Sequence, residues 1–201
     1  MNYEQTVAEF LAKPANLPFA LEVAQHVEKA KDHLQVQFWN LYYADMEKRL
    51  HASSNAGRWK VIFTRPGQLL AEFQSCWLQF DVGHTQSIQL HVGLNAESRA
   101  NKYNCVYGLN WSRKQDGSSD PKVVGDLIQA LMARSLVVNT NDWWLTYTRL
   151  KYSLREDTFL IRYAKEPHAV VQEIGDIVWS LFTQMREPLE AANEAFAKYN
   201  P

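Results

Sequence analysis

The spacing of apolar residues changes twice along this chain, and that change constrains the fold more than any motif does. Over residues 1–53 and again over 165–201 apolar residues recur at helical spacing, whereas between 58 and 113 they alternate. An alternating strand buries one face of a sheet, and an amphipathic helix buries one stripe. We therefore predict an α+β fold: an antiparallel, strongly twisted sheet of four to six strands packed against a long N-terminal helix and a C-terminal helix. One core suits this length, so 1–201 is predicted to form a single domain.

The helical segments have recognisable ends. We predict a short helix over 1–12 and a long amphipathic helix from Phe19 to Ser53, with prolines between them that neither helix accommodates in its interior. Another helix is predicted to begin at Asp120-Pro121, because Asp caps a helix and Pro fits its first position. A final helix is predicted from Pro167, and Pro188 is expected to interrupt or kink it.

Alternation predicts the strands at residues 59–63, 77–82, 88–94, 103–111 and 143–154. The clearest pair is the hairpin over 77–94, where one side of each strand is apolar and the other polar. Gly108 lies inside a strand, which indicates a bulge or the close approach of another element.

Two cysteines, Cys76 and Cys105, fall in predicted strands without the paired spacing of a zinc or redox site. We interpret them as buried thiols of a reducing compartment. No secretion signal or membrane-spanning apolar run is recognisable, so the sequence predicts a cytoplasmic protein with no membrane partner.

Charge is distributed unevenly along the chain. Residues 58–165 carry 14 basic and 9 acidic side chains, whereas both ends carry more acidic than basic ones. A basic sheet attracts an acidic partner or a phosphate backbone. Arg58, Lys60, Arg149 and Lys151 are the residues through which we expect nucleic acid to bind, if it binds. Tyrosines beside Arg149 and Lys151 resemble the mixture found on single-strand binding surfaces.

The tryptophan pair Trp143-Trp144 is the other candidate binding element. Adjacent side chains of a strand point to opposite faces, so one ring is expected in the core while the other meets a helix, a partner or water.

No phosphate-binding loop, nucleophile elbow, zinc-binding motif or calcium loop is present, so we assign no catalytic residue, expect no cofactor and favour a protein that is not an enzyme. The weak candidates for a metal site are Asp81 and His91, with Gln89 between them in the hairpin. A carboxylate, an amide and an imidazole can hold a divalent ion. The alternative is an ordinary solvated sheet face.

The predicted order of elements is helix, antiparallel sheet, helix, strand and helix. Together with Phe38-Trp39 and the stretch Asp157-Thr-Phe-Leu-Ile-Arg162, this order resembles the accessory or C-terminal region of bacterial and phage PD-(D/E)xK nuclease-like proteins. Nucleases of that group carry an Asp on one strand and an acidic-x-Lys on the next. The matching positions are Asp81 and Gln89-Leu90-His91, where Gln lacks the charge of a magnesium ligand and His replaces the lysine. The resemblance thus implies a copy without nuclease activity.

Three functions follow as hypotheses. The first is a non-enzymatic, cytosolic module that binds a protein partner or assembles with itself. The second is a nucleic-acid-binding or degenerate nuclease-like protein. The third is a small-ligand binder or enzyme whose site lies between sheet and helix.

Overall fold

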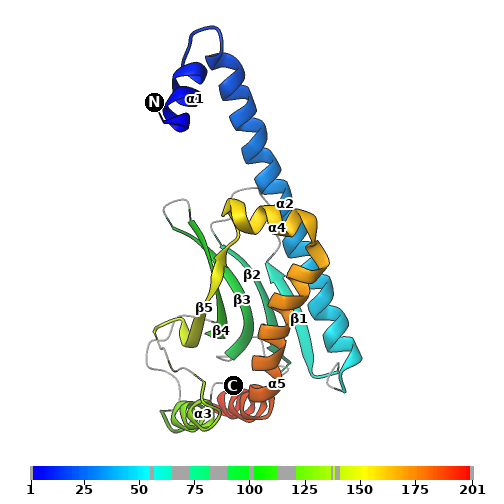
Figure 1. The fold of residues 1–201 in the computed structure, drawn as a ribbon. Coiled ribbons are helices and arrows are strands. Elements are labelled where there is room, and N and C mark those ends of the chain that lie inside the picture. Colours follow the sequence, from blue (N-terminus) through cyan, green and yellow to red (C-terminus); the bar gives the residue numbers. More distant parts are fainter. Residues whose placement is uncertain are drawn as a thin grey trace.

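The computed structural model describes residues 2–54, 57–64, 73–81, 90–99, 102–112, 121–136, 138 and 141–199. The elements follow one another as α1 (Tyr3–Leu11), α2 (Leu17–Ala52), β1 (Trp59–Thr64), β2 (Phe73–Phe80), β3 (Leu90–Arg99), β4 (Lys102–Trp111), α3 (Pro121–Ala133), β5 (Trp144–Ser153), α4 (Asp157–Lys165) and α5 (Pro167–Tyr199). The predicted α+β class is confirmed (Figure 1).

The sheet is an antiparallel meander in which the strands lie in the order of the sequence, β1-β2-β3-β4-β5. One row of its inner face runs Val61, Leu78, Val92 and Leu109, each paired with the next. The predicted hairpin over 77–94 therefore has its apolar side on the inner face. The loop of that hairpin, with Val82 and His84, lies outside the described residues.

Two helices cover the inner face of the sheet, the C-terminal part of α2 and the long helix α5 (Figure 1). Aromatic rings join the layers: Trp39 stacks on Phe63 of β1 with ring centroids 6.3 Å apart, and Trp59 meets Phe182 of α5 edge-on at 4.9 Å. Because each ring removes a large apolar area from water, these contacts supply much of the core.

The outer face has a row of its own, in which Trp77, Gly93, Gly108 and Tyr147 are paired from β2 to β5. A Cβ on Gly108 would lie 2.1 Å from the backbone oxygen of Thr146. The sequence indicated that another element approaches Gly108 closely, and this element is the neighbouring strand β5. Glycine fits here because only a residue without Cβ leaves room for that backbone.

Three helix boundaries differ from the sequence prediction. Pro18 lies in the first turn of α2, where a missing N–H costs nothing, so the helix begins at Leu17 rather than after the proline. α5 is not interrupted at Pro188, since Met185 and Leu189 on either side are both buried in the core and hold the helix together, and its axis changes direction in its C-terminal part, which agrees with the kink that was the other expectation (Figure 1). The stretch from Asp157 forms the separate helix α4.

α2 also differs from its prediction in its packing. Its core side chains, from Gln35 to Leu50, all belong to the C-terminal part. α1 and residues 17–27 of α2, which we call the N-terminal arm, extend beyond the rest of the protein (Figure 1). The base of the arm is held by ion pairs from α2 to the α4 region, Lys31 to Asp157 at 3.0 Å and Arg155 to Asp32 at 2.5 Å.

None of the described helices has the length and apolar character needed to cross a bilayer.

Candidate functional site

The N-terminal arm carries most of the large apolar side chains that water reaches. Of thirteen exposed large hydrophobic residues in the described part of the chain, nine belong to it. They are Tyr3, Val7, Phe10, Leu11, Leu17, Phe19, Leu21, Val23 and Val27. Scattered apolar residues are normal on a protein surface, whereas a concentration of them on one projecting part of the chain indicates an interaction site.

These side chains lie in stripes along both arm helices. On α1 the exposed apolar residues follow helical spacing from Tyr3 to Leu11. On α2 there are two stripes: Leu17 and Leu21 continue the line of the core residues, whereas Phe19 and Val23 lie on the opposite flank. A helix with two apolar faces needs more than one neighbour to bury them.

The connection between the arm helices is well defined. The Asn16 side-chain amide donates to the backbone oxygen of Phe10 at 2.8 Å, and the Leu17 N–H donates to the oxygen of Lys13 at 2.9 Å. No side chain of α1 is buried, so α1 does not shield α2. The arm thus presents its apolar stripes in a fixed arrangement.

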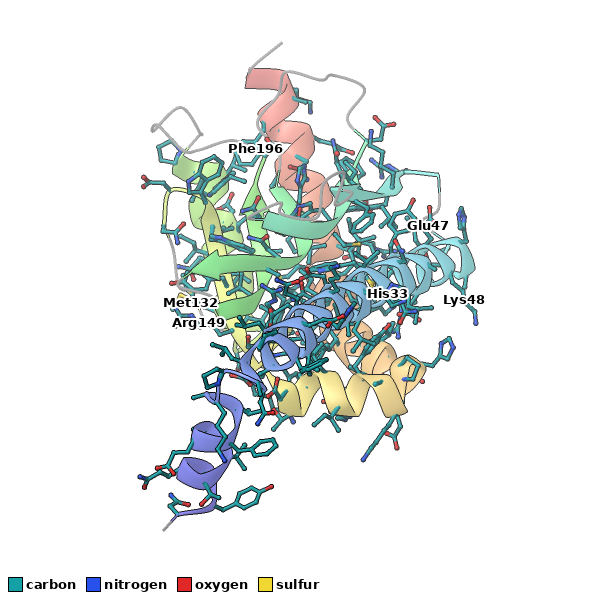
Figure 2. The ribbon with its side chains drawn as sticks, turned by 90° about the horizontal axis from the view of Figure 1, so that it is seen from above. His33, Glu47, Lys48, Met132, Arg149 and Phe196 are labelled. Carbon is teal, nitrogen blue, oxygen red and sulfur yellow. The ribbon has the colours of Figure 1, made fainter. Side chains whose placement is uncertain are left out.

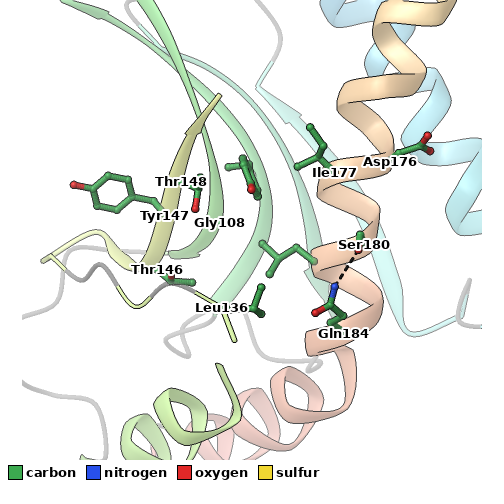
Figure 3. A pocket seen from close by; sticks show the side chains of 11 residues that line it. Gly108, Leu136, Thr146, Tyr147, Thr148, Asp176, Ile177, Ser180 and Gln184 are labelled. Carbon is green, nitrogen blue, oxygen red and sulfur yellow. Dashed lines mark hydrogen bonds between the residues drawn. The ribbon is translucent and has the colours of Figure 1, made fainter. Parts of the chain in front are cut away.

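The second candidate site is a cleft of about 440 Å³ between the β4–β5 part of the inner sheet face and α5 (Figure 3). Thr146 and Thr148 form its strand wall. Ser180 and Gln184, one helical turn apart and joined by a 3.0 Å hydrogen bond, form its helix wall. This cleft lies where the third hypothesis expects a site, between sheet and helix.

The cleft is electrically neutral. The described residues that line it include no lysine, arginine or histidine, and their one carboxylate, Asp176, forms an ion pair with Arg49 of α2 at 2.7 Å. Hydroxyl, amide and backbone groups therefore provide its polar chemistry, and Ile177 and Leu181 provide an apolar side. Such a lining suits uncharged groups better than phosphates or carboxylates.

The structure places the two predicted tryptophans differently. Trp143 precedes β5 and is 50 % exposed, whereas Trp144 is only 5 % exposed. Trp144 is covered on the outer sheet face, where its ring lies 5.6 Å from that of Trp77 and 5.9 Å from that of Tyr147. Only Trp143 has a ring that a partner can reach.

The four predicted basic residues do not form one surface, although Arg149 and Lys151 lie two residues apart in β5. Arg58 forms ion pairs with Glu190 and Glu194 of α5 and lies over the Phe80 ring, so its charge is already balanced. Lys60 belongs to β1 and Arg149 to β5, at opposite edges of the sheet. Three strands separate them, so they form no continuous basic patch with one another.

Asp81 directly follows β2 and His91 lies in the neighbouring strand β3, but the two differ in environment. Asp81 is exposed, whereas burial, with a smaller effect of Lys60, lowers the pKa of His91 to about 4. The Nε2 atom of His91 is buried without a hydrogen-bond partner in the described part of the chain. Those residues contain no group of three His, Cys, Asp or Glu side chains able to hold a metal. Gln89 lies outside them.

Cys76 and Cys105 are both free and buried. Burial raises the pKa of each thiol above its ordinary value. A protonated, inaccessible thiol is a poor nucleophile. The two cysteines are therefore core residues rather than reactive groups.

The sequence analysis identified neither the exposed apolar surface of the N-terminal arm nor the residues of the cleft. The apolar spacing of the arm was visible, but it was interpreted as a core stripe because periodicity does not identify the neighbour. Ser180, Gln184 and Thr148 gave no signal, since isolated polar residues of this kind occur on every surface.

Comparison with protein family models, with curated proteins and with solved structures finds no significant match for this chain.

Proposed function

We propose that this protein is a non-enzymatic assembly module whose N-terminal arm packs against the arm of a second copy. The observation that carries the proposal is the set of nine exposed apolar side chains on α1 and residues 17–27. Water contact with so much apolar surface is unfavourable, and a second arm removes it from water.

The exposed area supports a specific interface. The nine exposed fractions add up to about five whole side chains, and at roughly 150–200 Å² for each this is about 750–1,000 Å². A stable interface buries about 800 Å² per partner, which is the area that one arm offers.

A symmetric pair also fits the arrangement of the stripes. Two apolar faces on α2 and one on α1 are more than a single partner helix can cover, whereas two arms together provide four helices. Two-fold pairing is the commonest symmetry of identical chains. The arm carries few charges, Glu4, Glu9 and Glu22 with His26, and Lys13 lies in the connection between its helices, so repulsion between two copies is small.

The other hypotheses have less support. Nucleic-acid binding through all four predicted residues is unfavourable, because Arg58 is already paired and Lys60 lies at the opposite sheet edge from Arg149 and Lys151. The resemblance to PD-(D/E)xK accessory regions stays a prediction.

The test is the oligomeric state of the full chain, measured by light scattering during gel filtration. We expect a dimer for the wild type and a monomer for the double variant Phe19→Asp with Leu21→Asp, which places a charge on each apolar face of α2. Ile161→Asp is the matched control, because Ile161 of α4 is 56 % exposed and Leu21 is 57 % exposed.

Ile161→Asp should stay dimeric and keep the wild-type helix content. A wild type that is monomeric at about 100 μM, well above the dissociation constant of an ordinary interface of this size, contradicts the proposal. So does a double variant that remains dimeric.

A further inference from the structure

A second binding surface is available at the opposite side of the protein from the C-terminal part of α2, along the free edge of β5. In the described residues β4 is the only strand that pairs with β5. β5 is ten residues long, and Thr148, Arg149 and Lys151 in its middle part are exposed. The unpaired N–H and C=O groups of such an edge are able to pair with another extended chain.

The neutral cleft runs beside this edge. Because side chains alternate along a strand, Thr146 and Thr148 point toward α5, whereas Tyr147 points away from it (Figure 3). A chain paired with β5 would therefore direct every second side chain toward Ser180, Gln184 and Leu181. A groove between an edge strand and a helix is a known arrangement for binding an extended peptide.

The charges on the two sides of the edge differ. The cleft side contains no cation and only the paired carboxylate of Asp176, so an uncharged side chain fits there. On the other side, Arg149 makes no ion pair with any described residue. Lys151 lies over the Tyr152 ring, with its Nζ 4.9 Å from the ring centroid, and has a 3.9 Å contact with Glu173. An acidic side chain on that side meets a basic edge.

We propose that the β5 edge and the adjoining cleft bind an extended peptide in which acidic and uncharged side chains alternate. The peptide backbone pairs with β5, the uncharged side chains enter the cleft between Thr148 and Ser180, and the acidic ones face Arg149. The N-terminal arm takes no part in this contact.

The probe is the peptide acetyl-Glu-Val-Glu-Val-Glu-Val-amide, labelled with a fluorophore and titrated with the full chain. Binding should weaken about tenfold or more in Ser180→Trp, where an indole on the helix wall fills the cleft. Arg149→Glu should weaken it by a similar factor, because the new charge repels the peptide. Lys48→Glu is the matched control, since Lys48 is exposed on α2 at the other side of the protein (Figure 2). It should bind as the wild type does.

Amide hydrogen exchange supplies a readout specific to strand pairing. Amides of β5 should exchange more slowly when the peptide is bound, and those of β1 should not change. The monomeric arm variant should bind the peptide equally well, which separates this inference from the proposed assembly.

Several outcomes overturn the inference. They are no binding up to about 1 mM peptide, equal binding to Ser180→Trp, and equal binding of the peptide with Lys in place of Glu. If single-stranded DNA binds in a way that depends on Arg149 and the peptide does not bind, this edge is assigned to nucleic acid instead.

Discussion

The two halves of α2 have similar apolar patterns and opposite environments. Leu50 in the C-terminal half is 4 % exposed, whereas Leu21, in line with it on the same side of the helix, is 57 % exposed. The C-terminal half of α2 contacts β1 and α5, whereas its N-terminal half reaches beyond both (Figure 1). An apolar stripe therefore shows that a helix needs a packing partner, but it does not show whether the same chain provides that partner.

The largest expected effect comes from making the same change in both halves. Leu50→Ala should lower the free energy of unfolding by about 2–5 kcal/mol, because it leaves a cavity in the core. Leu21→Ala should change it by less than about 0.5 kcal/mol in the dissociated monomer. Urea unfolding at low protein concentration measures both. Equal effects of the two substitutions would end the distinction between arm and core.

A second pair of variants compares a crowded glycine with an open one. Gly108→Ala places a Cβ 2.1 Å from the backbone oxygen of Thr146 and should cost about 1–3 kcal/mol or more. Gly125→Ala in α3 meets no atom within 4 Å and should stabilise the protein by about 0.5–1 kcal/mol, because alanine favours a helix. Thermal unfolding distinguishes a lower Tm for the first from a higher Tm for the second. Two variants with the same sign would contradict the packing of β4 against β5.

The pH dependence of stability tests the buried imidazole. The folded-state pKa of His91, about 4, lies below the ordinary value of 6.5, so the unfolded chain binds a proton between these values that the folded protein does not. Stability from this group is present above about pH 6.5 and is lost as the pH falls toward 4. Between pH about 7 and about 5 the wild type should lose about 2 kcal/mol more than His91→Gln. Parallel stability curves for the two proteins would show that His91 is not buried.

The smallest expected effect concerns the base of the arm. Arg155 pairs with Asp32 and Glu28 and is half-buried, so Arg155→Met should cost about 1 kcal/mol and speed amide exchange near residue 32. Lys122→Met removes a fully exposed pair with Asp126 in α3 and should cost less than about 0.5 kcal/mol. If Arg155→Met leaves exchange near residue 32 unchanged, the arm is anchored by other contacts.

Much of the fold could be predicted from local patterns. Val61, Leu78 and Val92 share the inner face as alternation indicated, since the strand backbone itself turns successive side chains to opposite faces. The helix ends were less accurate. Pro18 and Pro188 act only on local hydrogen bonds, and the core contacts of Met185 and Leu189 outweigh the one that Pro188 removes.

The candidate site could be predicted only in part. Trp143 is available to a partner, as one ring of the pair was expected to be, but its partner ring Trp144 is covered by Trp77 from a distant strand. Arg149 became a candidate for a different reason, since its place on an edge strand beside a neutral cleft follows from the sheet order and the position of α5.

The sequence by itself determined most of the helices and strands, with α4 as the exception, and which face of each is apolar, because these properties depend on backbone geometry within a few residues. Only the tertiary structure decided that Leu50 is covered while Leu21 is bare, that Gly108 touches β5, and that a cleft separates Thr148 from Ser180. Those outcomes depend on where segments far apart in the chain come to lie, and no local pattern records that position.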